Sequence, residues 1–450
     1  MMEIFIVLGE FTFLLLICSF LVFSFYSLIE KEKRTFWRST LFLVGLGVVN
    51  FGFRLAPSPL NAWLFGAVFG LFVIFLIFLF VPPLKKKPVE IVGKQEKVDE
   101  RDVIFARFDL IEGTQNYMDY YGRKPENRKV DDEIRKIPDI LATPHFEKSP
   151  ALFSLAAAEF DFLEHQLTQV QGEVFPESVR SSPSDNTHLV KDIAKYLGAD
   201  ICGVSLLDQA YVYSHVGRGP EPFGQKIVLE HKYAVAFAVE MDLGMVASAP
   251  RAPVVVETGK KYVEAAKISI IVARFIRRLG YPARAHVAGS NYQAMLPPIA
   301  WMSGLGELGR IGILITERFG PRVRLGLVTT DLPLIPDVPK RLGVQEFCQR
   351  CQKCARNCPA QAIPDGDKSE ESGVRKWVLN REECYRFWRK AGTDCAMCIY
   401  VCPYSKLDNS FHDFIRKMAE RSSFAQSLSI RADDLFYGRS PRKKISPLGI

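Results

Sequence analysis

Eight of the ten cysteines in this 450-residue chain lie between residues 348 and 402, and their spacing constrains the fold more than any other feature. The first run reads C-x2-C-x2-C-x3-C-P and the second reads C-x2-C-x3-C-P, with one further cysteine between the two runs. This pattern is typical of bacterial ferredoxins with two clusters, in which the fourth cysteine of a run ligates the other cluster. The spacing therefore predicts two [4Fe–4S] clusters.

The same rule divides the eight thiolates into two sets of four. We expect one cluster to be ligated by Cys348, Cys351, Cys354 and Cys402. We expect the second cluster to be ligated by Cys384, Cys395, Cys398 and Cys358. Zinc prefers two short cysteine knuckles with four ligands per ion, which fits these runs poorly. A disulfide framework is not expected for close C-x2-C pairs in a large chain.

Three apolar segments, residues 4–29, 39–53 and 59–82, lie near the N-terminus. A helix needs about 20 apolar residues to cross a bilayer, and the first and third segments are long enough. The second segment is shorter and contains three glycines. The first segment is too long for a signal peptide and lacks a basic start. The sequence therefore predicts an anchor of three transmembrane helices over residues 1–84.

The basic residues of the short loops indicate how this anchor is oriented. Loops rich in lysine and arginine stay in the cytoplasm, and such residues lie after the first and third segments: Lys31, Lys33, Arg34, Arg38, Lys85, Lys86 and Lys87. We expect a multi-pass protein of the cell (inner) membrane with its catalytic domain on the cytoplasmic side, where the reducing environment protects thiolates. The net charge of +8 is modest, and nucleic-acid binding is not indicated.

The remaining chain alternates helical and extended patterns. Apolar spacing predicts helices over 151–171, 185–198, 259–279 and 408–420, and strands over 199–206, 209–214, 233–239, 311–316 and 322–330. This alternation favours an α/β core. We expect a linker and N-terminal cap over 85–150, a catalytic core over 151–335, a ferredoxin-like domain over 336–410, and a C-terminal helix with a basic tail over 411–450.

Five ordered features surround the cysteine runs: R-R-L-G-Y-P-A from Arg277, Asn291, G-L-G-E-L-G-R-I-G-I-L from Gly304, F-G-P-R-V-R-L from Phe319, and T-D-L-P from Thr330. In this order they resemble the reductive dehalogenases, and the similarity covers residues 190–405, including Trp388 and Gly392 between the cysteine runs. The resemblance implies an α/β (α+β) nitroreductase-like core that binds cobalamin, with a ferredoxin-like module of two [4Fe–4S] clusters beside it.

The resemblance also implies roles for individual residues. The family's catalytic tyrosine maps onto Tyr262, its supporting asparagine onto Asn291 and its cationic partner onto Arg324. Reductive cleavage of a carbon–halogen bond leaves a carbon centre that must take a proton. A tyrosine beside an arginine can donate that proton, because the cation stabilises the phenolate left behind.

The glycine-rich loop is a candidate contact for the corrinoid, because glycines let the backbone approach a large ring. Its residues in this role would be Gly304, Gly306, Glu307, Gly309 and Arg310. The family binds its cobalamin without a protein histidine below the cobalt, so none of the seven histidines is expected to be a ligand.

These features predict a membrane-anchored reductive dehalogenase that acts on an organohalide and receives electrons from a ferredoxin, a flavoprotein or a quinol. Most members of the family carry a twin-arginine signal and use a separate anchor, and neither is visible here. Two alternatives stay open. An epoxyqueuosine reductase acts on tRNA with the same cofactors, but uses an aspartate as its acid. A non-catalytic membrane ferredoxin subunit would leave the core unexplained. The sequence does not specify the organohalide or the oligomeric state, and a homodimer is one open arrangement.

Overall fold

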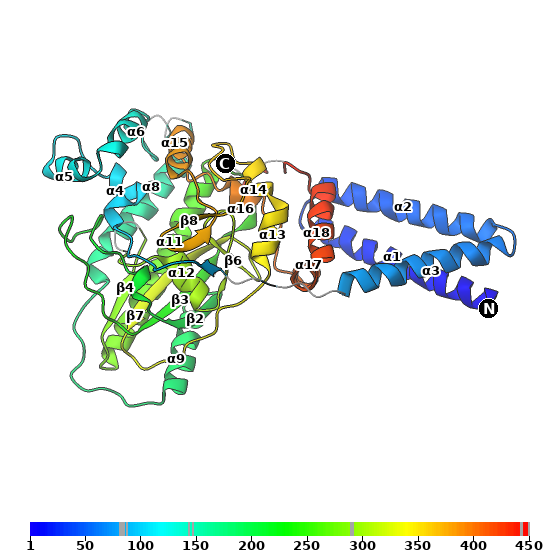
Figure 1. Cartoon of the computed structure of the whole chain (residues 1–450), viewed down its shortest axis with the longest axis horizontal. Coiled ribbons are helices and arrows are strands. Elements are labelled where there is room, and N and C mark those ends of the chain that lie inside the picture. The colour runs from blue at the N-terminus through cyan, green and yellow to red at the C-terminus, as the bar shows by residue number, and fades with distance from the viewer. Residues whose placement is uncertain are drawn as a thin grey trace. The chain divides into compact units, whose positions relative to one another are not determined.

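The computed structural model in Figure 1 describes residues 1–80, 86, 89–142, 145, 148–288, 292–441 and 444–448. The chain forms two units, Met1–Lys86 with Lys406–Arg442, and Lys87–Ser405 with Lys443–Ile450. The sequence predicted the C-terminal helix, but gave no sign that it belongs with the N-terminal segments. The predicted boundaries at residues 150 and 335 lie inside the second unit and stay predictions.

The first unit contains three long helices, α1 (Met2–Ile29), α2 (Lys33–Leu55) and α3 (Leu60–Phe80). All three are long and apolar enough to cross a membrane, so the predicted second segment is part of a longer helix. Two more helices complete the unit, α17 (Ser410–Arg421) and α18 (Ser423–Phe436). Phe23 of α1 joins them to the long helices, because its ring lies 5.0 Å from that of Phe411 and 4.8 Å from that of Phe436.

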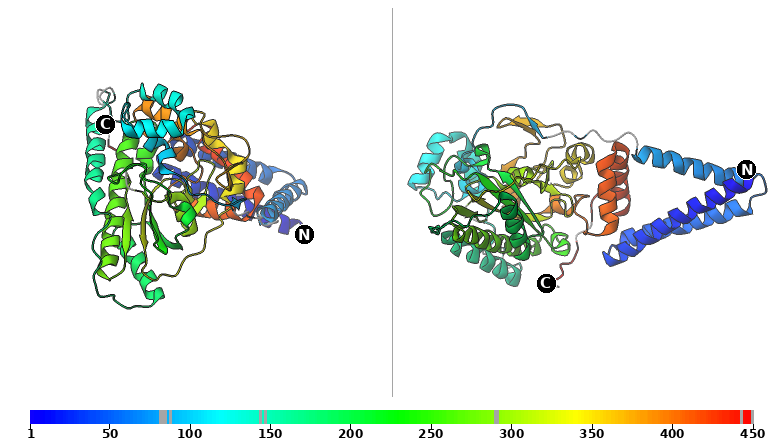
Figure 2. Two further views of the ribbon diagram at one scale, coloured as in Figure 1. Left: turned by 60° about the vertical axis from the view of Figure 1, so that its left-hand side comes forward. Right: turned by 90° about the horizontal axis from the view of Figure 1, so that it is seen from below.

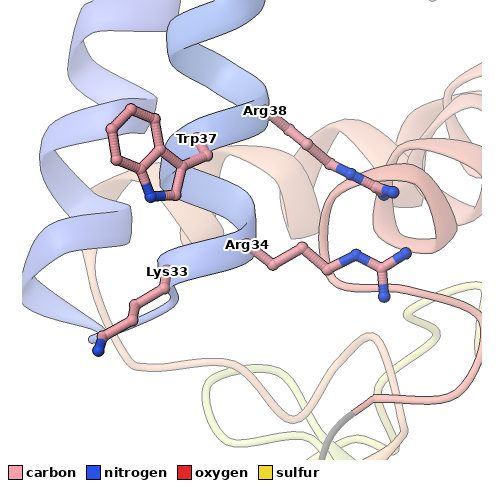
Figure 3. Close-up of a pocket in the computed structure, with 4 residues that line it drawn as sticks. All are labelled: Lys33, Arg34, Trp37 and Arg38. Carbon is pink, nitrogen blue, oxygen red and sulfur yellow. The ribbon is translucent and has the colours of Figure 1, made fainter.

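A cavity of about 450 Å³ lies at the start of α2 and is lined by Lys33, Arg34, Trp37 and Arg38. The two guanidinium groups extend to the same side of the helix, whereas Trp37 and Lys33 project to the other (Figure 3). Tryptophan and cationic side chains are enriched where membrane helices reach the lipid headgroups. The composition of this cavity is therefore typical of a membrane interface.

The second unit is built on a four-stranded sheet with the order β2 (Ile201–Leu206), β3 (Tyr233–Glu240), β7 (Val323–Thr330) and β4 (Ala283–His286). Strand β3 is internal, as its apolar sequence predicted. Every pairing in this sheet is antiparallel. The core is therefore α+β, because helices cover an antiparallel sheet, and the term nitroreductase-like stays a prediction.

The two faces of β3 carry side chains of different size. Its valines and Phe237 pack with α11 (Pro253–Arg278) in one buried cluster, and its alanines pack with α12 (Leu296–Met302) in another. Successive side chains of a strand point to opposite faces, so helices cover both faces of the sheet (Figure 2). Helices α8 (Pro150–His165) and α9 (Pro183–Tyr196) add to the face that α11 covers.

Three expectations about single elements need correction. The predicted strand 209–214 is wrong, because Gln209–Tyr211 is a 3-10 turn whose Ala210 N–H donates to the Asp208 side chain. The predicted strand 311–316 is shorter, since only β6 (Leu314–Thr316) is extended, paired with β5 (Gly306–Leu308). The predicted helix 259–279 begins earlier, at Pro253, where proline suits a first helical position.

Candidate active site

The cysteines lie on four short helices of the second unit: α13 (Val344–Cys351), α14 (Lys353–Arg356), α15 (Arg381–Ala391) and α16 (Met397–Tyr400), and on the turns between and after them. Left-handed backbone occurs at Cys395 itself, with φ of 61°, and directly beside cysteines at Gln352, with φ of 51°, and Ala396, with φ of 52°. Such residues reverse the chain within one or two positions. The turns therefore bring cysteines that are close in sequence to one small volume.

The thiols lie close enough together to shift one another's pKa, and Cys354 has neighbours in both predicted sets. Burial raises the pKa of Cys402, and the thiols of Cys348, Cys351 and Cys354 raise it further. Burial likewise raises the pKa of Cys395 to about 12, with Cys384 and Cys358 among its charged neighbours. These neighbours are the ones that the sequence predicted for each cluster. The ligand sets themselves stay a prediction, and buried thiols of this kind need a bound metal to ionise at neutral pH.

Arg310 gives an independent test of whether a cluster fits here. Its side chain is fully buried, and it donates to the carbonyl oxygens of Cys348 at 3.1 Å, Pro364 at 2.7 Å and Gly366 at 2.9 Å. Burial lowers its pKa, while the thiols of the first set oppose this shift. Carbonyl oxygens carry no full charge, so this cation fits beside a negatively charged iron–sulfur cluster.

The rest of the glycine-rich loop faces protein. A side chain at Gly306 would lie 2.3 Å from the Ile315 carbonyl oxygen, and one at Gly304 would lie 2.8 Å from that of Val338. A side chain at Gly309 would lie 2.4 Å from Ile315. The buried Glu307 carboxylate accepts the N–H groups of Leu342 and Val344. These contacts hold the loop against the cysteine-bearing segment, and its contact with a corrinoid stays a prediction.

Tyr262 and Arg324 meet between helix α11 and strand β7. The guanidinium carbon of Arg324 lies 5.0 Å from the centre of the Tyr262 ring. Burial opposes the charge on Arg324, but Tyr262 and Asp394 outweigh it and raise the arginine's pKa. Both side chains keep part of their surface accessible. The structure thus brings two of the three predicted catalytic residues together; Asn291 lies outside the described residues.

Two further residues, which the sequence analysis missed, complete this arrangement. One nitrogen of Arg324, Nη2, donates to Thr258 Oγ1 and to Asp394 Oδ2, each at 2.6 Å. Thr258 lies one turn before Tyr262 on α11, and the four-residue spacing puts both on one face. Asp394 directly precedes Cys395. A charged residue beside a cluster ligand, in the stretch G-T-D-C, was the available signal.

Several polar groups at this place suit a bound ligand. Among the described residues, Arg324 Nε and Asp394 Oδ1 are buried without a hydrogen-bond partner. Burial and then the neighbouring Tyr262 raise the pKa of Tyr292 well above its ordinary value. A buried donor or acceptor without a partner is costly, so these groups fit a cofactor or substrate with polar atoms.

Several known proteins are similar to this chain in sequence. Residues 347–406 match the family described as 4Fe-4S dicluster domain. The tetrachloroethene reductive dehalogenase of Dehalobacter restrictus is 32% identical over 307 residues, which is 58% of this chain and 55% of that protein. The enzyme of the same name from Sulfurospirillum multivorans is 31% identical, over 57% of this chain and 58% of that protein.

The chain is thus similar in sequence to reductive dehalogenases over more than half of its length. A catabolic reductive dehalogenase solved with 3-bromo-4-hydroxybenzoic acid shares the fold, with a TM-score of 0.64 and 24% identity over 80% of this chain and 49% of that one. The chain spans a little over half the length of the two reductive dehalogenases matched by sequence. An epoxyqueuosine reductase from Atelocyanobacterium thalassa is 32% identical over 111 residues, or 23% of this chain and 35% of that protein.

Proposed function

We propose that the chain is a membrane-anchored reductive dehalogenase that replaces a carbon–halogen bond of an organohalide with a carbon–hydrogen bond. The reaction consumes two electrons and one proton, and the halide leaves with the electron pair of the broken bond. The observation that supports this most is the position of the Arg324 guanidinium, 5.0 Å from the centre of the Tyr262 ring. A cation beside a phenol stabilises the phenolate that proton donation leaves.

In this proposal Tyr262 is the acid of the reaction and donates its hydroxyl proton to the carbon that loses the halide. Arg324 stabilises the resulting phenolate through its charge. Asn291, which the resemblance maps onto the family's asparagine, orients the phenol or the substrate. The Arg324 side chain is only 15% exposed, which strengthens its interaction with the phenolate relative to bulk water.

The two cysteine sets would hold two [4Fe–4S] clusters, which would supply one-electron transfer. A cobalamin, when bound, supplies the cobalt chemistry at the halogenated carbon. The protein's part is to orient the substrate and to supply the proton. The loop from Gly304 to Arg310 is proposed to line the boundary between the corrinoid and the first cysteine set.

The apolar helices α1, α2 and α3 are proposed to anchor the enzyme in the cell membrane, with residues 85–450 in the cytoplasm. A ferredoxin, a flavoprotein or a quinol would deliver the electrons. A reporter domain fused after residue 450 tests the orientation, because the lysines and arginines that follow α1 and α3 favour the cytoplasm. We expect a reporter that works only in the cytoplasm to be active, and activity of a periplasmic reporter would reverse the orientation.

The activity is tested by anaerobic purification of the full chain with added cobalamin. Reduced protein is then incubated with halogenated phenols, alkenes and alkanes, and released halide is measured. We expect one halide ion for every two electrons consumed. A protein that retains iron and cobalt but releases no halide from any of these classes would remove the support for dehalogenation.

An epoxyqueuosine reductase is the second candidate, because one such enzyme is 32% identical over 111 residues. That reaction would use an epoxyqueuosine-containing tRNA and would need no halide. The same reduced protein is therefore incubated with this tRNA, and nucleoside analysis shows whether queuosine forms. Queuosine formation without halide release would favour the second candidate.

A further inference from the structure

Asp394 lies where the cysteine-bearing segment of the second unit meets helix α11 and strand β7. It directly precedes Cys395, a predicted cluster ligand, yet its side chain points to α11 and β7, where it meets Thr258 and Arg324. Its side chain is 9% exposed and that of Arg324 is 15% exposed. The carboxylate is thus the countercharge of the arginine that faces Tyr262.

The three side chains form a closed triangle. Arg324 Nη2 donates to both Thr258 Oγ1 and Asp394 Oδ2, and the Thr258 hydroxyl donates to the same Asp394 oxygen, with all three distances at 2.6 Å. The hydroxyl accepts from the cation and donates to the anion, so each group has the polarity its neighbour needs. Hydrogen bonds to charged groups are about twice as strong as neutral ones. The triangle therefore fixes the direction of the guanidinium.

The loop that carries Asp394 is itself tied to the catalytic core. The Thr393 hydroxyl donates to the Pro250 carbonyl oxygen at 2.7 Å, close to the start of α11. Gly392, with φ of 71°, ends helix α15, and Ala396 N–H donates to the carbonyl oxygen of Asp394 at 2.7 Å. Because its backbone is held at both ends, Asp394 can act as a fixed point for Arg324.

We propose that Asp394 is a positioning residue, which holds the Arg324 guanidinium against the Tyr262 ring. Through this contact the iron–sulfur segment helps to build the acid that completes the reaction. The proposal rests on the proposed function for its link to turnover, but the position of the arginine can be measured without any substrate. Without the carboxylate, a buried guanidinium loses its charge partner and moves toward solvent or another acceptor.

The position of Arg324 is tested with 3-fluorotyrosine incorporated at residue 262 of the full chain, with both clusters loaded and oxidised. Fluorine NMR is recorded for the unaltered protein, Asp394→Asn, Arg324→Gln and the double variant. We expect Asp394→Asn to move the fluorine resonance in the same direction as Arg324→Gln, and to cause no further movement in the double variant. A resonance that stays at its original position in Asp394→Asn overturns the proposal.

Glu240→Gln is the matched control, because Glu240 pairs at 2.6 Å with Arg322, another buried arginine two residues from Arg324. This variant should leave the resonance of residue 262 in place. If Asp394→Asn fails to load the second cluster, Thr258→Val carries the test instead, since it removes one corner of the triangle from α11. Thr258→Val should then move the resonance in the same direction, and an unmoved resonance would contradict the positioning role.

Turnover gives the second readout. We expect Asp394→Asn to lower kcat roughly 10- to 100-fold, as is usual for residues that orient a functional side chain, and to change KM little. In the Arg324→Gln background the same substitution should have almost no effect on kcat, because two residues that act as one unit are not additive. If the effects of the two substitutions on kcat multiply in the double variant, Asp394 acts independently of Arg324. If the unaltered protein has no activity, the proposed function is wrong. The fluorine NMR result then still tests whether Asp394 positions Arg324.

Discussion

Arg310 and Arg324 are both largely buried in the second unit, but their surroundings differ. Arg310 donates to three main-chain carbonyl oxygens and lies 4.6 Å from the centre of the Trp377 ring. Arg324 has a carboxylate and a hydroxyl as partners and lies 5.0 Å from the centre of the Tyr262 ring. The first arginine lies beside the thiols of one cysteine set, and the second beside a phenol.

This difference indicates what each arginine requires. A buried cation whose partners are uncharged carbonyls depends on a negative charge nearby, which a thiolate-ligated cluster supplies. Among the described residues each arginine has one buried nitrogen without a hydrogen-bond partner, Nη2 in Arg310 and Nε in Arg324, but only Arg324 has a carboxylate as a hydrogen-bond partner. Arg310 is therefore suited to stabilise a negatively charged iron–sulfur cluster, and Arg324 is suited to contact a reacting group.

If the reaction takes place beside Arg324 and not beside Arg310, the largest effect on turnover is expected from the phenol of Tyr262. Tyr262→Phe removes the proposed acid and keeps the ring, so we expect kcat to fall about 10²- to 10⁴-fold with iron and cobalt content unchanged. Tyr281→Phe is the control, because Tyr281 lies beyond the C-terminal end of α11 and its hydroxyl donates to the Val179 carbonyl oxygen. Unchanged turnover in Tyr262→Phe would refute its role as the acid.

If Arg310 stabilises the cluster of only one cysteine set, a substitution in the other set should leave that cluster intact. Cys358→Ala is expected to damage the cluster ligated by Cys384, Cys395 and Cys398, because Cys358 neighbours Cys384 and Cys395. Electron paramagnetic resonance of the reduced protein should show one intact cluster. Cys202→Ala, a half-buried thiol in strand β2, should keep both clusters. Loss of the cluster predicted to use Cys402 would reverse the assignment.

Much of this organisation could be predicted from the sequence, because it depends on local patterns. Cysteine spacing predicted the region that matches a 4Fe-4S dicluster domain. Apolar run lengths predicted three long helices, and the uninterrupted apolar run at 233–239 predicted an internal strand. Each of these signals needs only neighbours in the sequence.

The parts that sequence missed depend on contacts between distant segments. Nothing near Asp394 in the chain indicates that it pairs with Arg324, 70 residues earlier. The predicted approach of the glycine-rich loop to a corrinoid stays a prediction, but the sequence did not show that Gly306 and Gly304 also lie against the backbone of Ile315 and Val338. A glycine in the sequence indicates that another group lies close to the backbone, but not whether that group is a cofactor or another part of the protein.

The role of Arg310 as a charge partner is tested by the reduction potential of the first cluster. Arg310→Gln removes a buried positive charge beside Cys348, so the reduced, more negative cluster becomes less favourable. We expect a fall in potential on the order of 60 mV, which corresponds to about 1.4 kcal/mol for one electron. Arg310→Lys should restore most of the potential, and Arg277→Gln, at a buried arginine that donates to the Ala283 carbonyl oxygen, should not change it. Equal potentials in Arg310→Gln and Arg310→Lys would contradict the role.

The smallest expected effect concerns the carboxylate of Glu159, on helix α8. Burial and then the neighbouring Glu257 raise the pKa of Glu159 from 4.5 to about 7, and among the described residues its Oε2 has no hydrogen-bond partner. A raised pKa means that the folded state binds this proton more tightly than the unfolded state does. The stability that Glu159 contributes is therefore complete below pH 4.5 and is lost as the pH rises through 7.

Glu159→Gln keeps the shape of the side chain and removes the charge that forms above pH 7. We expect the variant to melt on the order of 2 °C higher than the unaltered protein at pH 8, and at nearly the same temperature at pH 5, measured by calorimetry. Glu164→Gln, at an exposed position of the same helix, should show no such pH dependence. A gain of equal size at both pH values would place its cause in packing, because the charge of Glu159 is absent at pH 5.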